Sequence, residues 1–173
     1  MSILKIARLG HPVLRERARP LDPSEIDTPR VQRLIDDMFE TMNDSQGIGL
    51  AGPQVHQGIR LFVAGVDDEE GTMSPVVIIN PEITPLGSEI EEDWEGCLSI
   101  PDIRGRVPRA AEVRIRALDR RGAPISMTAN GFPARVVQHE TDHLDGVLFF
   151  DRMTSLESLT FLEEYSRFWT QKD

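Results

Sequence analysis

The stretch QHETDHLDG, residues 138–146, holds two of the four histidines of the chain and a glutamate directly after the first of them. If this stretch is helical, His139 and His143 lie one turn apart on the same face, so both imidazoles can point at one cation. Glu140 then lies about 100° further round the helix and borders the cation. His-Glu-x-x-His metal sites have this arrangement, with the carboxylate as general base. The alternative is a solvent-facing helix with scattered polar residues.

A catalytic metal needs a third protein ligand and an open position for water. Cys97, the single cysteine, lies between Gly96, which permits close backbone approach, and Pro101, which we expect to prevent a central strand. A thiolate is a strong ligand for zinc or ferrous iron. A lone cysteine is more often a small buried apolar residue, but beside the histidine pair we favour a ligand. The sequence around the other histidines, His11 and His56, does not indicate metal binding.

A glycine-rich stretch, GIGLAGPQV at residues 47–55, permits the backbone to approach a ligand closely. It is not a phosphate-binding loop, because no Gly-Lys-Ser/Thr follows it. Gln54 carries an amide that can donate a hydrogen bond to a developing oxyanion. The alternative is a flexible connection between a helix and a strand.

Three segments with apolar residues at helical spacing predict the helices that position these groups. The first spans residues 28–47, with Thr28 as its N-cap. The second follows Pro133, carries both histidines of the pair and has Gly146 as its C-cap. The third is a terminal helix within residues 155–169.

Strand-like sequence fills the middle of the chain. Branched apolar residues crowd residues 59–66 and 76–80 on either side of an acidic DDEEG loop, and residues 112–119 and 125–130 form a pair joined by the turn RRGAP. The connections are too short for parallel crossovers, so we expect antiparallel pairing. Helices and strands occur in separate runs, which predicts an α+β fold in one domain, residues 1–173. We expect antiparallel sheets packed around the histidine-bearing helix, with an N-terminal and a C-terminal helix.

Composition narrows the class of protein. The formal charge of −10, from 29 acidic and 19 basic side chains, disfavours binding to nucleic acid or anionic membranes. No apolar run approaches the roughly 20 residues of a transmembrane helix. The start of the chain, MSILKIARLGHPVL, lacks the apolar stretch of a secretory signal. We therefore expect a cytoplasmic protein with no nucleic-acid or membrane partner.

Three motifs, in this order, resemble the peptide deformylase family. The family patterns Gly-x-Gly-Leu-Ala-Ala-x-Gln, Glu-Gly-Cys-Leu-Ser and Gln-His-Glu-x-Asp-His are matched by GIGLAGPQ, EGCLS and QHETDH. LGHPVLR, NPEI and IPDIRGRVPR are also similar to the family, so the resemblance covers residues 3–155. Gly52 replaces the second alanine of the first motif, from which we expect a slightly looser loop and retained activity. The leucine after the cysteine and the short loops resemble the compact bacterial type.

This resemblance implies a metallohydrolase that removes the formyl group from the N-terminal formylmethionine of new polypeptides and releases formate. The implied metal ligands are Cys97, His139 and His143. The implied catalytic residues are Glu140 as proton acceptor and donor, with the Gln54 amide and the Leu98 N–H as donors to the oxyanion. The implied substrate-binding residues are Ile48, Gly49, Gly96, Arg104, Phe132 and Val136. For the apolar members of this set, ordinary core packing is the alternative.

The resemblance also implies a cofactor and partners. The family usually carries ferrous iron, and zinc, nickel or cobalt suit the same ligands. The partners are N-formylmethionyl nascent peptides. Some members dock on the ribosome through a basic C-terminal helix, but this chain has Glu157, Glu163 and Glu164 there, so we do not expect that mode. Two other functions remain open: a metalloprotease, which leaves Cys97 and the glycine-rich stretch unexplained, and a catalytically silent metal-binding paralogue.

Overall fold

A computed structural model of the protein describes residues 2–67 and 73–170. Residues 68–71 of the acidic DDEEG loop lie outside the described residues. The helices, including three short 3-10 turns, are η1 Pro12–Arg15, α1 Pro23–Ile26, α2 Pro29–Asp44, η2 Gly52–Val55, α3 Gly131–Leu144, η3 Phe149–Asp151 and α4 Leu162–Phe168. The strands are β1 Gly49–Ala51, β2 Leu61–Asp67, β3 Met73–Pro85, β4 Ile90–Cys97, β5 Ile100–Ala110, β6 Glu112–Leu118, β7 Pro124–Asn130 and β8 Thr160–Phe161.

The strands form two antiparallel sheets, as the short connections predicted. One sheet has the order β1-β2-β3-β6-β7 and the other the order β4-β5-β8. Val113, Ile115 and Ala117 alternate along β6 and are all buried, so one face of this strand packs into the core. Strand β3 is longer than expected and contains a register shift between Ile79 and Glu82. The α+β class is therefore confirmed.

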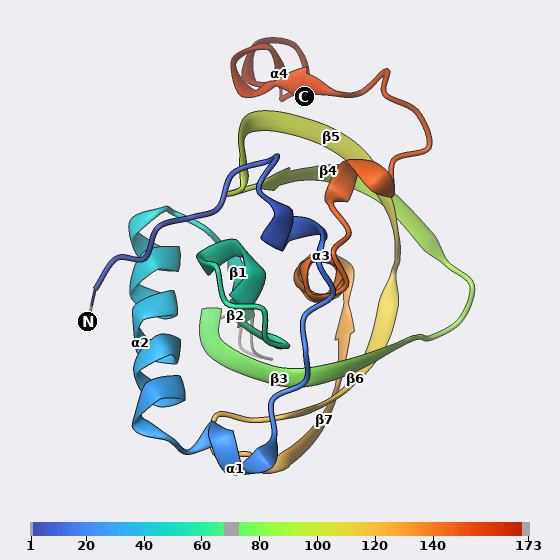
Figure 1. Ribbon diagram of the computed structural model, residues 1–173. Coiled ribbons are helices and arrows are strands. Elements are labelled where there is room, and N and C mark those ends of the chain that lie inside the picture. Colours follow the sequence, from blue (N-terminus) through green and yellow to red (C-terminus); the bar gives the residue numbers. More distant parts are fainter. Residues whose placement is uncertain (1, 68–72, 171–173) are drawn as a thin grey trace.

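Helix α3 lies at the centre of the fold. Figure 1 shows it nearly end-on, with the β4–β5 hairpin on one side and β3 and β6 on the other. Its apolar residues Val137 and Leu144 belong to a core cluster with Phe62 of β2 and Ile115 of β6. Because α3 is packed between these strands, the helix is fixed in position, and so are the polar residues on its remaining face.

Helix α2 packs on the outer side of the first sheet. Thr28 caps it, as expected, by accepting a hydrogen bond from the Val31 N–H, and Pro29 is its first residue. The helix ends at Asp44, three residues before the expected end at Gly47. The Gly47 N–H still bonds back to the Met42 carbonyl oxygen at 2.8 Å, so Gly47 closes the turn after the helix.

The expectation that Pro101 prevents a central strand is wrong, because Pro101 lies within β5, the middle strand of its sheet. The β4–β5 ladder shifts register at this place: Glu95 pairs with Gly105, and Cys97 with Ile100. Pro101 falls in the irregular part between these pairs, where its missing N–H breaks no paired position. The irregularity places Cys97 at the tight end of the hairpin.

The two C-terminal predictions need correction in their bounds. Helix α3 begins at Gly131 and ends at Leu144, so the C-cap is Asp145 and Gly146 follows it with a φ of 73°. The terminal helix is shorter than residues 155–169: α4 has seven residues and no buried one, and β8 precedes it. No helix in the described ranges is long and apolar enough to cross a membrane.

Candidate metal centre

The two histidines of the pair lie side by side on α3, as their spacing predicted. The ring centroids of His139 and His143 are 5.0 Å apart. His143 is 1% exposed and Glu140 is 4% exposed. This burial excludes the alternative of a solvent-facing histidine helix, because the polar face of α3 points into the protein.

Cys97 meets this histidine pair from the end of β4. Its Sγ atom is 3.2 Å from His143 Nε2, and one ligand atom each from Cys97, His139 and His143 lie within 4.8 Å of one another. A tetrahedral cation with bonds of about 2.1 Å to nitrogen and 2.3 Å to sulfur separates its ligand atoms by about 3.4 to 3.6 Å. The donor types and their spacing therefore fit one zinc-like or ferrous cation. In the described ranges no other group of three such side chains is gathered in this way.

The charge state of the thiol suits this role. Burial raises the pKa of Cys97, but the neighbouring His143 and His139 imidazoles outweigh it and hold that pKa well below its usual value. The thiolate is the form that ligates metals. The centre therefore offers a negative sulfur and two imidazoles to a cation.

Glu95 orients the first histidine. Its Oε2 atom is 2.8 Å from His139 Nδ1, so the Nδ1–H donates to the carboxylate and Nε2 faces the centre. Arg109 donates two hydrogen bonds to Glu95 at 2.9 and 3.0 Å, and Arg135 donates a third at 2.8 Å. Burial by itself raises the pKa of Glu95, but the hydrogen bonds from His139 and Arg109 outweigh this effect, and the resulting pKa is lowered to about 2.

This supporting carboxylate was missed by sequence reasoning, although a signal was present. Residues two apart in a strand point to the same face, and Glu95 precedes Cys97 by two in β4. Metal-ligating histidines usually donate their second N–H to a carboxylate. Together these rules identify Glu95 as the partner of a histidine near Cys97.

A second buried carboxylate extends the ion-pair network to the surface. Asp142 of α3 accepts hydrogen bonds from Arg109 at 2.5 Å and from Arg152 at 2.7 and 3.1 Å. Arg109 therefore joins Glu95 to Asp142, while the Arg152 side chain is half exposed. No pattern in the sequence indicates these pairings.

Glu140 lies beside the triad with one free carboxylate oxygen. Its Oε2 atom is buried and has no hydrogen-bond partner among the described residues. Burial is the main cause that raises its pKa to about 7. A Cβ atom on Gly49 would overlap this carboxylate, so only glycine at that position leaves room for Glu140. A buried carboxyl group with such a pKa can exchange a proton near neutral pH.

The amide of Gln54 also reaches the centre. Its Oε1 atom accepts a 2.8 Å hydrogen bond from the Ala51 N–H, which fixes the side chain. Its Nε2 atom donates to Cys97 Sγ at 3.5 Å and to Ser99 Oγ at 3.3 Å. Leu98 follows Cys97 in the same turn and packs against the apolar cluster around α2.

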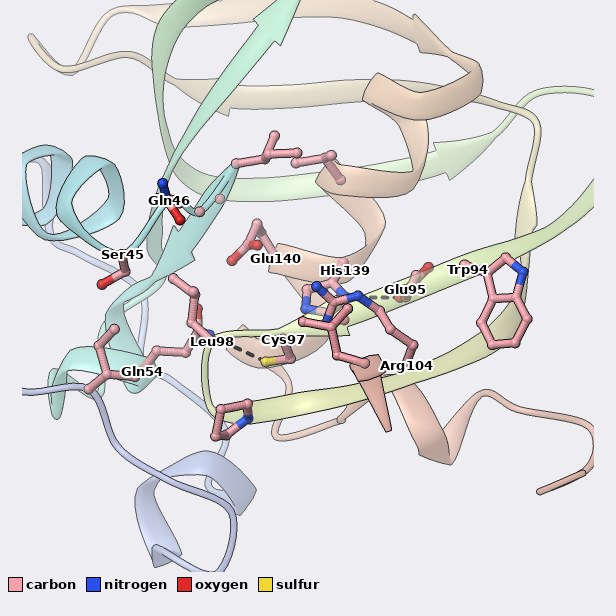
Figure 2. Close-up of a pocket in the computed structure, with 18 of the residues that line it drawn as sticks. Ser45, Gln46, Gln54, Trp94, Glu95, Cys97, Leu98, Arg104, His139 and Glu140 are labelled. Carbon is pink, nitrogen blue, oxygen red and sulfur yellow. Dashed lines mark hydrogen bonds and ion pairs between the residues drawn. The ribbon is translucent and has the colours of Figure 1, made fainter. Parts of the chain in front are cut away.

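These groups lie in one cleft of about 610 Å³. Figure 2 shows Gln54 and Trp94 toward opposite ends of the pocket, with Cys97 and His139 between them. The structure places every residue of the expected substrate-binding set in its lining, namely Ile48, Gly49, Gly96, Arg104, Phe132 and Val136. His11 and His56 lie elsewhere and pack against each other, with ring centroids 4.7 Å apart.

The expectation of a looser loop at Gly52 is wrong. A Cβ atom at this position would lie 2.8 Å from the Ile59 carbonyl oxygen and 2.9 Å from that of Gln57. The backbone thus occupies the space of the absent methyl group, so η2, which carries Gln54, is closely packed.

A cysteine, two histidines and a buried carboxylate at a cleft in an α+β fold define a candidate centre of a metal-dependent hydrolase. Comparison with known proteins identifies the family: residues 3–159 match the family model of polypeptide deformylase, and the chain belongs to this family.

Individual relatives agree with this assignment. A peptide deformylase of Chromohalobacter salexigens is 46% identical over 91% of this chain and 89% of its own length. A class I type b peptide deformylase of Acinetobacter baumannii, solved with Met-Ala-Ser bound, is 38% identical, covers 87% of this chain and 98% of its own, and has a TM-score of 0.82. The Thermotoga maritima peptide deformylase is 39% identical with a TM-score of 0.81, covering 88% and 99% of the two chains.

Proposed function

We propose that this chain hydrolyses the N-formyl group of N-terminal formylmethionine in nascent polypeptides, giving formate and a free amine. The observation that carries the proposal is the buried Glu140 carboxylate, unpartnered among the described residues, beside the Cys97, His139 and His143 donors. The Met-Ala-Ser peptide in the Acinetobacter baumannii enzyme supports a substrate that begins with methionine.

The proposed metal ligands are Cys97, His139 and His143, with Glu95 holding His139 by its Nδ1–H. When bound, a cation supplies Lewis acidity that lowers the pKa of water and polarises the formyl carbonyl group. We propose ferrous iron as the resident cation, with zinc, nickel and cobalt able to occupy the same donors.

Glu140 moves the proton in this proposal. Its free Oε2 takes a proton from the attacking water, and the oxygen of that water adds to the formyl carbon. The C–N bond then breaks, and the same proton passes to the departing amine. A pKa of about 7 suits both proton transfers, because the Glu140 carboxylate must accept the proton from water and then release it to the amine.

Gln54 and Leu98 are the proposed donors to the oxyanion that forms at the formyl oxygen. The Nε2 contacts of Gln54 with Cys97 and Ser99 are 3.5 and 3.3 Å, which is long for N–H donors. The amide can therefore exchange one of them for a shorter bond to the oxyanion. One such donor contributes about 3 kcal/mol to the transition state.

The remaining cleft residues form the proposed methionine pocket. Ile48 and Val136 provide an apolar wall near the centre, and Phe132, half exposed, borders the opening. Gly49 and Gly96 offer backbone groups for strand-like pairing with the peptide, and Arg104 borders the same cleft.

We propose that residues 1–173 act as a single catalytic domain in the cytoplasm. Docking on the ribosome through a basic terminal helix is not part of the proposal, because α4 begins with Glu163 and Glu164 in its first turn.

The test is formate release by protein purified without oxygen and loaded separately with each cation. Formate from a formyl-Met-Ala peptide is the expected result. Absence of formate at every cation would support a catalytically silent paralogue. Cleavage inside a longer unformylated peptide, in preference to deformylation, would support a metalloprotease.

A further inference from the structure

The cleft has a wall that lies outside the family match. That match ends at Leu159, and the next residues form β8 and α4. Strand β8 pairs with β5 through Ile103–Phe161 and Arg104–Thr160, directly beside a residue of the cleft lining. Figure 1 shows α4 lying across β5 at the end of the molecule where β4 and β5 lie. The C-terminal segment is thus built onto the cleft rather than extended away from it.

Aromatic packing holds α4 in this position. The Trp94 ring of β4 contacts Tyr165 with centroids 4.9 Å apart and Trp169 with centroids 5.4 Å apart. Trp94 also lines the cleft. The Trp94 side chain therefore contacts both the α4 region and the cleft, and its ring contacts hold α4 against β4.

Leu162, the first residue of α4, lines the cleft together with Trp94 and Arg104. Helix α4 buries none of its residues fully, so Leu162 is not a core residue. Leu162 is half-buried. The cleft that it lines has a volume of about 610 Å³, a size typical of pockets for ligands larger than one amino-acid residue. The metal centre and the methionine pocket therefore leave room for more of the peptide.

Building on the proposed deformylation, we propose that the β8–α4 segment forms a subsite for an apolar side chain that follows formylmethionine in the substrate. Leu162 and Trp94 are its walls and determine its specificity. Leu162 and Trp94 both present apolar surface. The guanidinium of the nearby Arg104 lies against Gly96 and donates a hydrogen bond to the Ile103 carbonyl oxygen at 3.0 Å. The segment thus adds a preference to the reaction without supplying a reacting group.

The experiment measures kcat/KM for formyl-Met-Ala-Ala-Ala and for peptides with Leu or Glu at the second, third or fourth position. The protein is the full chain in its metal-loaded form. We expect Leu to be preferred over Ala at one of these positions by about three- to tenfold, because a partly exposed apolar contact discriminates less than an enclosed pocket. Leu162→Ser should remove that preference, lowering kcat/KM for the Leu peptide more than for the all-Ala peptide.

Two further variants separate the subsite from a general structural effect. Phe168→Ser, also on α4 but 62% exposed and outside the cleft lining, should keep the preference. Leu162→Phe should narrow the subsite and slow the Leu peptide selectively. The two tryptophans of the chain, Trp94 and Trp169, both lie in the α4 contact, so unchanged tryptophan fluorescence verifies that α4 remains docked.

The outcomes distinguish the two proposals. Formate release without any preference for Leu, a preference for Glu, or a Leu preference that survives Leu162→Ser with α4 docked would overturn the subsite and leave deformylation intact. No formate from any peptide would overturn deformylation, and the subsite with it.

Discussion

Arg135 is the buried residue whose loss tests the supporting network most sharply. Its side chain is 6% exposed. The guanidinium donates to Glu95 Oε1 at 2.8 Å, to the Val107 carbonyl oxygen at 2.7 Å and to the Glu91 carbonyl oxygen at 2.7 Å. One side chain of α3 thus joins both strands of the β4–β5 hairpin to the carboxylate behind His139. Arg135→Met keeps most of the volume and removes all of these donors.

The expected loss of stability follows from burial. Removing one partner of a buried ion pair typically costs about 3 to 5 kcal/mol, because the other charge and its carbonyl neighbours lose their donors. For a chain of this length that corresponds to a Tm lowered by roughly 6 to 20 °C. Urea unfolding of the wild type and the variant, under conditions where unfolding is reversible, measures the difference. Glu95 keeps both Arg109 bonds, so we expect the variant to retain its metal when folded.

Arg106→Met is the matched control. Arg106 also lies on the hairpin and pairs with Glu92 at 3.5 Å, but their side chains are 45% and 41% exposed. An exposed pair contributes about 0 to 1 kcal/mol. Equal, small effects of the two substitutions would refute the reasoning that burial makes the Arg135 contacts important.

Three other predictions concern the site. Glu140→Gln should retain the metal and lower kcat by about 10²- to 10⁴-fold; formate assay and metal analysis measure both, and unchanged kcat would remove Glu140 from the mechanism. Cys97→Ser should weaken metal retention during dialysis against a chelator, and full retention would place the third ligand elsewhere. Gly52→Ala should destabilise the protein by about 1 to 3 kcal/mol in urea unfolding, because its methyl group would meet the Ile59 carbonyl oxygen. A Gly52→Ala variant as stable as the wild type, or more stable, would show that the backbone around Gly52 shifts easily to admit a methyl group.

The parts of the fold that rest on local patterns could be predicted from the sequence. The capped N-terminal helix, the antiparallel β6–β7 pair and the histidine-bearing helix all follow from periodicity and turn residues. The β4–β5 hairpin could not be read in the same way, since Pro101 lies where a register shift, visible only in the paired strands, accommodates it. The terminal helix was overestimated because Leu156 and Leu159 have helical spacing but are exposed and precede α4.

The candidate site divides in the same way. The chemistry of Cys97 and of the histidine pair predicted that they share one site, although Cys97 and His139 lie 42 positions apart in the sequence. The structure brings them together. Glu95 and Arg135 are long-range ion-pair partners whose meeting depends on how α3 crosses the hairpin. The tight packing around Gly52 likewise depends on backbone oxygens from a later segment. The pairing of Arg135 with Glu95 and the packing around Gly52 have no period in the sequence and leave no pattern there, whereas the spacing of Glu95 from Cys97 does.

X-ray absorption at the metal edge tests the central claim most directly. The protein is loaded with zinc or, without oxygen, with ferrous iron, and the scatterers around the cation are counted in wild type and Cys97→Ser. We predict one sulfur at about 2.3 Å and two imidazole nitrogens at about 2.1 Å for zinc, with an oxygen completing the shell and the sulfur lost in the variant. A shell of nitrogen and oxygen alone in the wild type would contradict the proposed centre.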